Sequence, residues 1–284
     1  MIPAPLRIVV GTGYLGVRVA RLWAARGDRV IGTTRSAARA EFLAEPGIEP
    51  RLLDVTTADW SEFFTATGLP ATLFWSVGFD RTAGASYHDV QVRGLTRMLD
   101  ALASGRRPAG QVDAAPIRPR VIFCSSTGVW GDESGELVDE TTPVNPSREA
   151  GRALVAAEAV LAAHAAGPGT ALRFAGLYGP GRYPRLDDLQ AGRPIAAEPD
   201  TWLNLIQIDD AARVVVAVAD ASAPGPLYVV SDGHPIRRRE WYARLAELSG
   251  SPPPSWDPTA LQSRGGNKRV NPARLFAEFP GLLS

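Results

Sequence analysis

Three glycines near the start of the chain have the spacing of a loop that cradles a phosphate. Residues 11–16 read Gly-Thr-Gly-Tyr-Leu-Gly and directly follow the apolar run 6–10. In a strand–turn–helix setting, the first glycine permits a tight turn, the second lets the backbone approach a pyrophosphate, and the third allows the helix to pack on the strand. The amino end of the helix attracts the anion. The pattern therefore predicts a dinucleotide-binding loop made by Gly11, Thr12, Gly13, Tyr14, Leu15 and Gly16.

The residues after the second expected strand bear on which dinucleotide this is. A site for NAD usually has Asp or Glu there, where the carboxylate bonds the ribose hydroxyls. Here residues 33–36 read Thr-Thr-Arg-Ser, and Asp28 comes before the strand. An acid would repel a 2′-phosphate, whereas arginine binds it. The sequence therefore favours NADP over NAD, with Arg35 and Ser36 in the cofactor site. The alternative is that Arg35 points into solvent.

Short apolar runs alternate with amphipathic stretches that would position this loop. Strands are expected at 6–10, 29–33, 51–53, 71–75, 120–124 and 170–174, and helices at 14–26, 36–44, 58–64, 86–103 and 147–165. This alternation indicates βαβ units, so the expected fold class is α/β, a Rossmann-type doubly wound parallel sheet. Ligands of such sheets bind at the carboxyl ends of the strands. The segment 106–119 contains Gly and several Pro and is expected to be a surface loop.

The rhythm changes after residue 174, which suggests a second lobe. Gly, Pro and Arg gather in 176–185, followed by expected helices at 209–220, 239–248 and 272–279 and a strand at 227–230. We expect an NAD(P)-binding Rossmann domain over 1–176 with a return segment at about 203–230. A smaller substrate-binding lobe would be built from 177–202 and 231–284.

Composition excludes several classes of function. Thirty basic residues balance thirty acidic ones, so no overall basic field exists to bind nucleic acid. The run 237–239 of three arginines is expected to be a solvated helix start. The single cysteine, Cys124, excludes an internal disulfide, and three scattered histidines predict no metal site. The sequence predicts no signal peptide and no membrane span, so a cytoplasmic protein is expected. Lys268 is the only lysine.

Several motifs recur in order over nearly the whole chain. They are VVGTGYLG at 9–16, LDV at 53–55, SSTGVWG at 125–131, DETTP at 139–143, LRFAGLYGPGR at 172–182 and NLIQIDDA at 204–211. With these motifs the chain resembles the extended short-chain dehydrogenases/reductases, the NAD-dependent epimerase/dehydratase family. The resemblance implies that Asp54 and Val55 lie by the adenine, that Ser76, Val77 and Gly78 flank the cofactor ribose, and that Phe174 passes near the nicotinamide. It also implies that Ser125 contacts the cofactor and that Ser126 takes the place of the catalytic Ser/Thr.

The chain departs from this family where the chemistry is done. The family's catalytic Tyr-x-x-x-Lys pair lies on one face of the helix after the serine motif. Residues 150–158 read AGRALVAAE, so Ala150 replaces the tyrosine and Leu154 the lysine. Gln91 likewise replaces the family's helix asparagine. General acid–base catalysis contributes about 10²- to 10⁴-fold. Because this pair is missing, the usual mechanism is absent, and the pattern resembles the atypical branch of extended members.

Other polar residues near the strand ends are candidates for the missing acid. Ser126 either donates a hydrogen bond to a substrate carbonyl or caps a turn. Glu149 points about 100° away from the lost tyrosine, and acts either as an acid or base or as a complement to the helix dipole. Tyr183 lies on a loop after the sixth strand and is the nearest tyrosine for proton transfer. Other polar groups at these strand ends are Asp80, Arg81, His88, Arg148 and Tyr178. Arg182 and Arg185 either bind an anionic substrate or lie in a solvated loop.

Two functional hypotheses remain open from the sequence. The first is an NADP-dependent oxidoreductase or epimerase/dehydratase that acts on a small polar substrate with a non-standard acid or base. The alternative is a catalytically inactive NADP-binding sensor or regulatory pseudoenzyme. A scaffold with a vestigial site is a third reading, against which the intact glycines argue. The helices at 86–103 and 147–165 make a homodimer possible.

Overall fold

The computed structural model describes residues 4–44, 47–105, 119–131, 134–167, 169–257 and 266–283. Its largest sheet has seven strands in the order β11-β7-β5-β4-β1-β2-β3. This is the strand order of a doubly wound dinucleotide-binding fold, and the neighbours β1–β2, β1–β4, β2–β3 and β4–β5 pair in parallel. The predicted α/β Rossmann-type class is therefore confirmed. The strands are β1 (Leu6–Val10), β2 (Arg29–Thr34), β3 (Ile48–Leu52), β4 (Thr72–Trp75), β5 (Arg120–Ser126), β7 (Gly169–Phe174) and β11 (Leu227–Val230).

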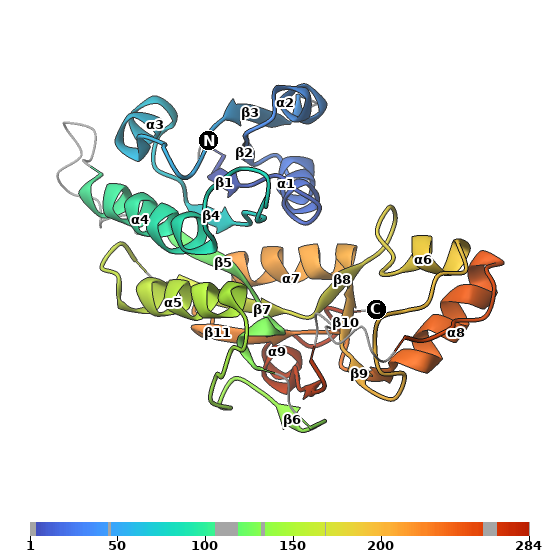
Figure 1. Cartoon of the computed structure of the whole chain (residues 1–284). Helices are drawn as coiled ribbons and strands as arrows, with labels where there is room; N and C mark the ends of the chain where they lie inside the picture. Colours follow the sequence, from blue (N-terminus) through green and yellow to red (C-terminus); the bar gives the residue numbers. More distant parts are fainter. Residues whose placement is uncertain are drawn as a thin grey trace. The chain divides into compact units, whose positions relative to one another are not determined.

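Helices follow the strands much as their apolar periodicity predicts. Helix α1 packs on β1 and β2, α2 packs on β2 and β3, and α3 packs on α4 (Figure 1). The expected helix over 86–103 contains a π-helical turn, Asp89–Arg93, and continues as α4. Residues 106–118 of the expected loop lie outside the described residues. The helix bounds are α1 Gly16–Ala25, α2 Ala37–Leu43, α3 Trp60–Thr67, α4 Gly94–Ser104, α5 Glu149–Ala163, α6 Leu186–Gln190, α7 Ile208–Asp220, α8 Arg238–Ser249 and α9 Ala273–Glu278.

The chain forms two compact units. The first unit comprises 1–125, 152–172 and 212–228, and the second comprises 126–151, 173–211 and 229–284. A large apolar cluster of the first unit joins β1, β4 and β5 to α3, α4 and α5, and it includes Ile8, Trp75 and Leu95, whose exposed fraction is zero. Because both faces of these strands are covered, they read as solid apolar runs in the sequence.

The second unit is built from short paired segments and a small apolar cluster of its own. Strand β8 (Gly176–Tyr178) pairs in parallel with β10 (Leu205–Gln207), and β13 (Arg269–Val270) pairs in parallel with β6 (Leu137–Val138). Strand β12 (Ile236–Arg237) pairs antiparallel with β9 (Trp202–Leu203). The apolar cluster contains Leu189, Ile195 and Tyr242 from α6, the following turn and α8. The sequence did not indicate these two- and three-residue strands.

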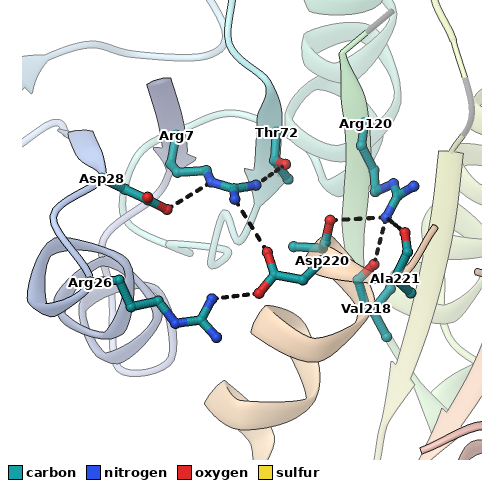
Figure 2. Close-up of polar contacts among 9 residues, drawn as sticks. Arg7, Arg26, Asp28, Thr72, Arg120, Val218, Asp220 and Ala221 are labelled. Atoms are coloured by element: carbon teal, nitrogen blue, oxygen red, sulfur yellow. Dashed lines mark hydrogen bonds and ion pairs between the residues drawn. The ribbon is translucent and has the colours of Figure 1, made fainter. Parts of the chain in front are cut away.

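Arginines fix the amino ends of three adjacent strands in the first unit (Figure 2). Arg7 of β1, Thr72 of β4 and Arg120 of β5 lie side by side in register. The Arg7 guanidinium donates to the Asp28 carboxylate at 2.9 Å, to the Thr72 hydroxyl, and to Asp220 at the end of α7 at 3.2 Å. Arg120 donates to carbonyls at the end of α7, those of residues 218 and 219, and to the carbonyl of residue 221 just after the helix. A cation at a helix carboxyl end satisfies orphan carbonyls and complements the dipole.

Candidate functional site

A pocket in the first unit opens at the carboxyl ends of four neighbouring strands. Its volume is about 220 Å³. The phosphate loop, the residues after β2, the residues after β3 and the residues after β4 all line it. The lining residues are Gly11, Thr12, Gly13, Thr33, Thr34, Arg35, Arg39, Leu53, Asp54, Val55, Thr56, Val77, Gly78, Asp80, Ala83 and Val90.

The three glycines of the loop are used in three different ways. Gly11 has φ +89°, and a Cβ there would lie 2.7 Å from the carbonyl oxygen of Ser76. A Cβ on Gly16 would lie 2.3 Å from the carbonyl oxygen of Gly11, so this glycine lets α1 start against the loop. Gly13 has no atom within 4 Å of such a Cβ and lines the pocket. The fold therefore requires Gly11 and Gly16, while the open space beside Gly13 is part of the pocket.

The loop is tied to the end of β2 by hydrogen bonds. The Thr12 amide and hydroxyl both donate to the carbonyl oxygen of Thr33, at 3.0 and 2.9 Å. The Gly11 amide donates to the Thr33 hydroxyl at 3.1 Å. These bonds hold the loop beside the end of β2, and the loop and Arg35 line the same pocket.

Two arginines from the segment after β2 reach this pocket. Arg35 donates to the Asp80 carboxylate at 2.9 Å, and its side chain is 41% exposed. Arg39 of α2 donates from Nε and Nη2 to the Thr12 carbonyl, at 3.2 and 3.1 Å. Arg39 is not among the site residues predicted from the sequence. The available signal was a second arginine four residues after Arg35, in the first turn of the expected helix 36–44.

Two carboxylates also line the pocket, and both are held by threonines. The Asp54 carboxylate accepts from the Thr56 amide and hydroxyl, at 2.8 and 2.6 Å. Burial raises the pKa of Asp54, but the bonds from Thr56 and the charges of Arg35 and Arg97 outweigh this and lower the pKa below its usual value. Hydrogen bonds from Thr82, and then the Arg35 guanidinium, lower the pKa of Asp80. Both acids are therefore ionised at neutral pH.

Gln91 fixes the turn that follows β4. Its side-chain amide donates to the Val77 carbonyl at 2.8 Å, and its oxygen accepts from the Trp75 indole at 3.2 Å. It lies in the π-helical turn, a distortion often found at functional sites. Gln91 thus positions the pocket residues Val77 and Gly78.

The other predicted cofactor residues lie outside the pocket lining. The Arg18 guanidinium lies over the Tyr14 ring, 4.4 Å from the ring centroid, and Leu15 is buried. Ser36 caps α2, its hydroxyl accepting from the Arg39 amide. Ser76 donates its amide to Val10 in the sheet, the Ser125 hydroxyl donates to the Glu158 carboxylate at 2.5 Å, and Phe174 is buried in β7.

The three predicted catalytic residues all belong to the second unit. The Ser126 hydroxyl accepts from the Gly128 amide at 3.1 Å, so it caps the short turn Thr127–Val129. Glu149 is exposed in the first turn of α5, and Tyr183 is 40% exposed with its ring 6.5 Å from that of Tyr178. Within the residues that the structure describes, no hydrogen bond joins these three side chains.

The helix where the family resemblance would put the Tyr-x-x-x-Lys pair packs closely on the turn that follows Ser126. A Cβ on Gly151 would lie 2.6 Å from the Gly128 carbonyl oxygen and 2.7 Å from a carbon of Pro146. Ala150 is half-buried in the same turn of α5. One turn further on, Leu154 packs against the apolar cluster of the first unit. At the position where the resemblance would put the lysine, the side chain thus makes a core contact.

The single lysine supports the backbone after the serine motif. Lys268 is 2% exposed, and its ammonium donates to the carbonyls of Trp130 and Gly131, at 3.3 and 3.2 Å. Asn204 holds the lysine segment from the other side, bonding the Lys268 carbonyl and the Val270 amide, each at 2.8 Å. Lys268 thus joins the C-terminal segment to the loop that follows Ser126.

A carboxyl with a raised pKa lies elsewhere in the second unit. Burial raises the pKa of Asp232, and the nearby charge of Asp210 raises it further, against the lowering effect of the His234 amide bond. Burial, and then the charges of Asp232 and Asp210, raise the pKa of the Tyr178 phenol. Asp232 is not among the residues predicted from the sequence, because its raised pKa depends on burial and on Asp210, which is distant in sequence.

The described residues contain neither a helix long and apolar enough to cross a bilayer nor a group of three or more potential metal ligands.

Comparison with known proteins places the whole chain among relatives. It is 31% identical over 281 residues to Protein YeeZ of Escherichia coli K12, covering 95% of this chain and 93% of that one. A solved structure of a Methylobacillus flagellatus protein assigned to the NAD-dependent epimerases/dehydratases is 30% identical, covers 97% of this chain and 92% of its own, and has a TM-score of 0.75. WbmG of Bordetella bronchiseptica, solved with NAD and UDP, shares the fold at 18% identity, with coverage of 98% and 89% and a TM-score of 0.79.

The family model gives the same answer. The model of the "NAD dependent epimerase/dehydratase family" matches residues 8–231, which include the glycine loop, the serine motif and β11. The resemblance inferred from the motifs is confirmed, and so is an NAD(P)-binding protein of the epimerase/dehydratase type. The chain belongs to the NAD dependent epimerase/dehydratase family.

Proposed function

We propose that the chain binds NADP in preference to NAD, with the adenosine half in the pocket of the first unit. The observation that carries this proposal is that Arg35 and Arg39 line the same pocket as the phosphate loop, while the end of β2 offers threonines where an NAD site has an acid. The volume of about 220 Å³ is below the roughly 300–1,000 Å³ of a pocket for a whole ligand, which suits one half of a dinucleotide.

The residues present fit such a cofactor. Gly13 has open space toward the pocket, as a pyrophosphate needs. Asp54, held by Thr56, offers carboxylate oxygens at the place where the family resemblance puts the adenine, and Arg35 offers a charged donor for the 2′-phosphate. The cofactor would supply the hydride; the protein residues described here bind and orient it.

The proposal is tested with ligands that differ only in the 2′-phosphate. Titration calorimetry would compare 2′,5′-ADP with 5′-AMP, and NADP with NAD. A charge-assisted hydrogen bond contributes about 1.5–3 kcal/mol, so Arg35→Ala should weaken 2′,5′-ADP by roughly 10- to 150-fold and leave 5′-AMP nearly unchanged. Arg93→Ala is the matched control, because Arg93 also pairs with an aspartate on the surface but lies outside the pocket. Equal affinities of the native protein for NADP and NAD would overturn the preference.

For the reaction, we propose an oxidoreductase or epimerase/dehydratase step on a small polar substrate with a non-standard proton donor from the second unit. The candidates are Ser126, Tyr183 and Glu149 from the sequence, together with Asp232. Burial and the charge of Asp210 raise the pKa of Asp232, and a carboxyl that keeps its proton closer to neutral pH is suited to general acid catalysis. Asp232→Asn should remove the fall in rate at high pH that loss of the Asp232 proton causes, whereas Tyr183→Phe, Ser126→Ala or Glu149→Gln should preserve this fall.

The inactive-sensor alternative is not favoured by the family membership, but it predicts a distinct result. A sensor would bind NADP without converting any substrate in single-turnover experiments. We further propose that the second unit binds the substrate, that the protein is cytoplasmic and does not bind nucleic acid, and that it forms a homodimer. Sedimentation of the native protein tests the last point.

A further inference from the structure

Asp80 is a carboxylate inside a pocket whose arginines suit a phosphate. It follows β4 by five residues and lines the same pocket as Arg35, although the two are 45 residues apart. Its Oδ2 accepts from Arg35 Nη2 at 2.9 Å. The arginine best placed for an anionic ligand therefore already holds an anion belonging to the protein.

The Asp80 carboxylate is fixed before any ligand arrives. Its Oδ1 accepts from the Thr82 amide at 2.9 Å and from the Thr82 hydroxyl at 2.6 Å, which leaves Oδ2 for Arg35. This is a local turn that an aspartate makes with the backbone two residues on. The carboxylate thus keeps its place when Arg35 moves, and both side chains are near 40% exposed, so a ligand reaches the pair from solvent.

The other charged groups that line the pocket have partners of their own, so Arg35 is the residue for which Asp80 and a ligand would compete. Arg39 is bound to the Thr12 carbonyl, and Asp54 is held by Thr56. In the part of the chain that the structure describes, Asp80 is the hydrogen-bond partner of Arg35. A 2′-phosphate that binds Arg35 must either displace Asp80 or share the guanidinium with it. Displacement breaks the Arg35–Asp80 ion pair, and sharing brings the two anions within a few ångströms of one another.

We propose that Asp80 is a specificity-determining residue that competes with the 2′-phosphate of the cofactor for Arg35. It lowers the affinity for NADP and leaves the affinity for NAD nearly unchanged, because NAD carries no group that needs Arg35. This inference rests on the proposed binding of NADP at this pocket. Asp80 therefore sets how strong the preference is, while Arg35 sets its direction.

The test removes the charge and keeps the shape. In Asp80→Asn, affinity for 2′,5′-ADP should rise by about 3- to 10-fold at low salt, affinity for 5′-AMP should change less than 2-fold, and the gain should shrink as salt rises. Thr82→Val, which releases the carboxylate from its hydroxyl partner, should give a smaller change in the same direction. Asp89→Asn is the matched control, since Asp89 also bonds a hydroxyl and an arginine but lies outside the pocket lining.

A double-mutant cycle separates this inference from the proposed function. In the Arg35→Ala background, Asp80→Asn should no longer strengthen 2′,5′-ADP, since the competition passes through Arg35. If Arg35→Ala weakens 2′,5′-ADP but Asp80→Asn leaves it unchanged or weaker, the competitor role is wrong and the NADP site stands. If Arg35→Ala has no effect on 2′,5′-ADP, the NADP site itself is wrong.

Discussion

Arginines lie at both ends of the strands in the first unit, and they are used in opposite ways. At the amino ends, Arg7 is only 12% exposed and its guanidinium reaches three different partners, while Arg120 donates to the carbonyl end of a helix (Figure 2). At the carboxyl ends, Arg35 is 41% exposed and holds one carboxylate. The donors of an arginine are equally numerous in both places. At the amino ends most of these donors bond to protein acceptors. At the carboxyl ends, some of the donors of Arg35 remain available to a ligand.

The cost of charge differs between the two ends as well. Burial, and next the charge of Arg7, lower the pKa of Arg120, so the amino-end cluster keeps its cations against an unfavourable environment. The bonds to the α7 carbonyls compensate for this. Around the pocket the charged side chains are hydrated. Their desolvation therefore costs less free energy, and their ion pairs contribute less to stability. The comparison predicts that substitutions at the amino end change stability and that those at the carboxyl end change binding.

The largest expected effect comes from filling the open space at Gly13. Gly13→Val should abolish cofactor binding, by at least about 100-fold, because the side chain occupies the place where the backbone meets the pyrophosphate. The free energy of unfolding should change little, since nothing lies within 4 Å of the new Cβ. Cofactor titration and urea unfolding measure the two quantities. Gly11→Ala is the contrasting variant: its Cβ would lie 2.7 Å from a carbonyl oxygen, so it should unfold more easily. Normal binding in Gly13→Val would show that the loop is not the binding site.

At the amino end, Arg7→Ala should have the reverse signature. It leaves the Asp28 carboxylate, 12% exposed, without its charged partner. Breaking a buried pair costs about 3–5 kcal/mol, and the remaining exposure reduces this to roughly 2–4 kcal/mol in urea unfolding. Affinity for NADP should stay within 2-fold. Arg26→Ala is the control, because its pair with Asp220 is exposed and should contribute under about 1 kcal/mol. Equal losses in both variants would contradict the role assigned to burial.

The smallest effect is a pH dependence that belongs to the pocket. The folded state lowers the pKa of Asp54 below its ordinary 3.8, so its contribution to stability is fully present above pH 3.8 and is lost as pH falls through the lowered value. Between pH 5 and pH 2.5, the native protein should therefore lose slightly more unfolding free energy than Asp54→Asn, by less than about 1 kcal/mol. Chemical unfolding at the two pH values measures the difference. A steeper acid loss in the variant would reverse the sign of this assignment.

The sequence was sufficient where a signal is local. Solid apolar runs located β1, β2 and β4 within one residue, and the spacing of the glycines located the loop. The third strand was placed at 51–53, but it runs over Ile48–Leu52. Glu49 and Pro50 interrupt its apolar pattern, which an edge strand tolerates. A local apolar pattern indicates a buried strand, and an edge strand such as β3 is less buried, so its pattern is weaker.

What the sequence could not predict depends on distant partners. The π-helical turn at Gln91 is accompanied by a bond to the Val77 carbonyl, 14 residues away. Strand β8 exists because it pairs with β10, beginning at Gly176 and Leu205. The arginine run was expected to be solvated, but Arg238 is 5% exposed and bonds Thr201 and the Gly266 carbonyl. The pair of Arg35 with Asp80 likewise joins residues that no spacing rule connects.

Because the single lysine, Lys268, is buried, amine-reactive reagents should label the folded protein slowly at side chains. Every other basic side chain is an arginine, so reagents that acylate lysine find no accessible side-chain amine on the folded chain. Acylation of Lys268 requires the loop after Ser126 and the C-terminal segment to separate, because its ammonium is held by the carbonyls of Trp130 and Gly131. The rate of labelling at this one atom therefore measures how often the second unit opens locally.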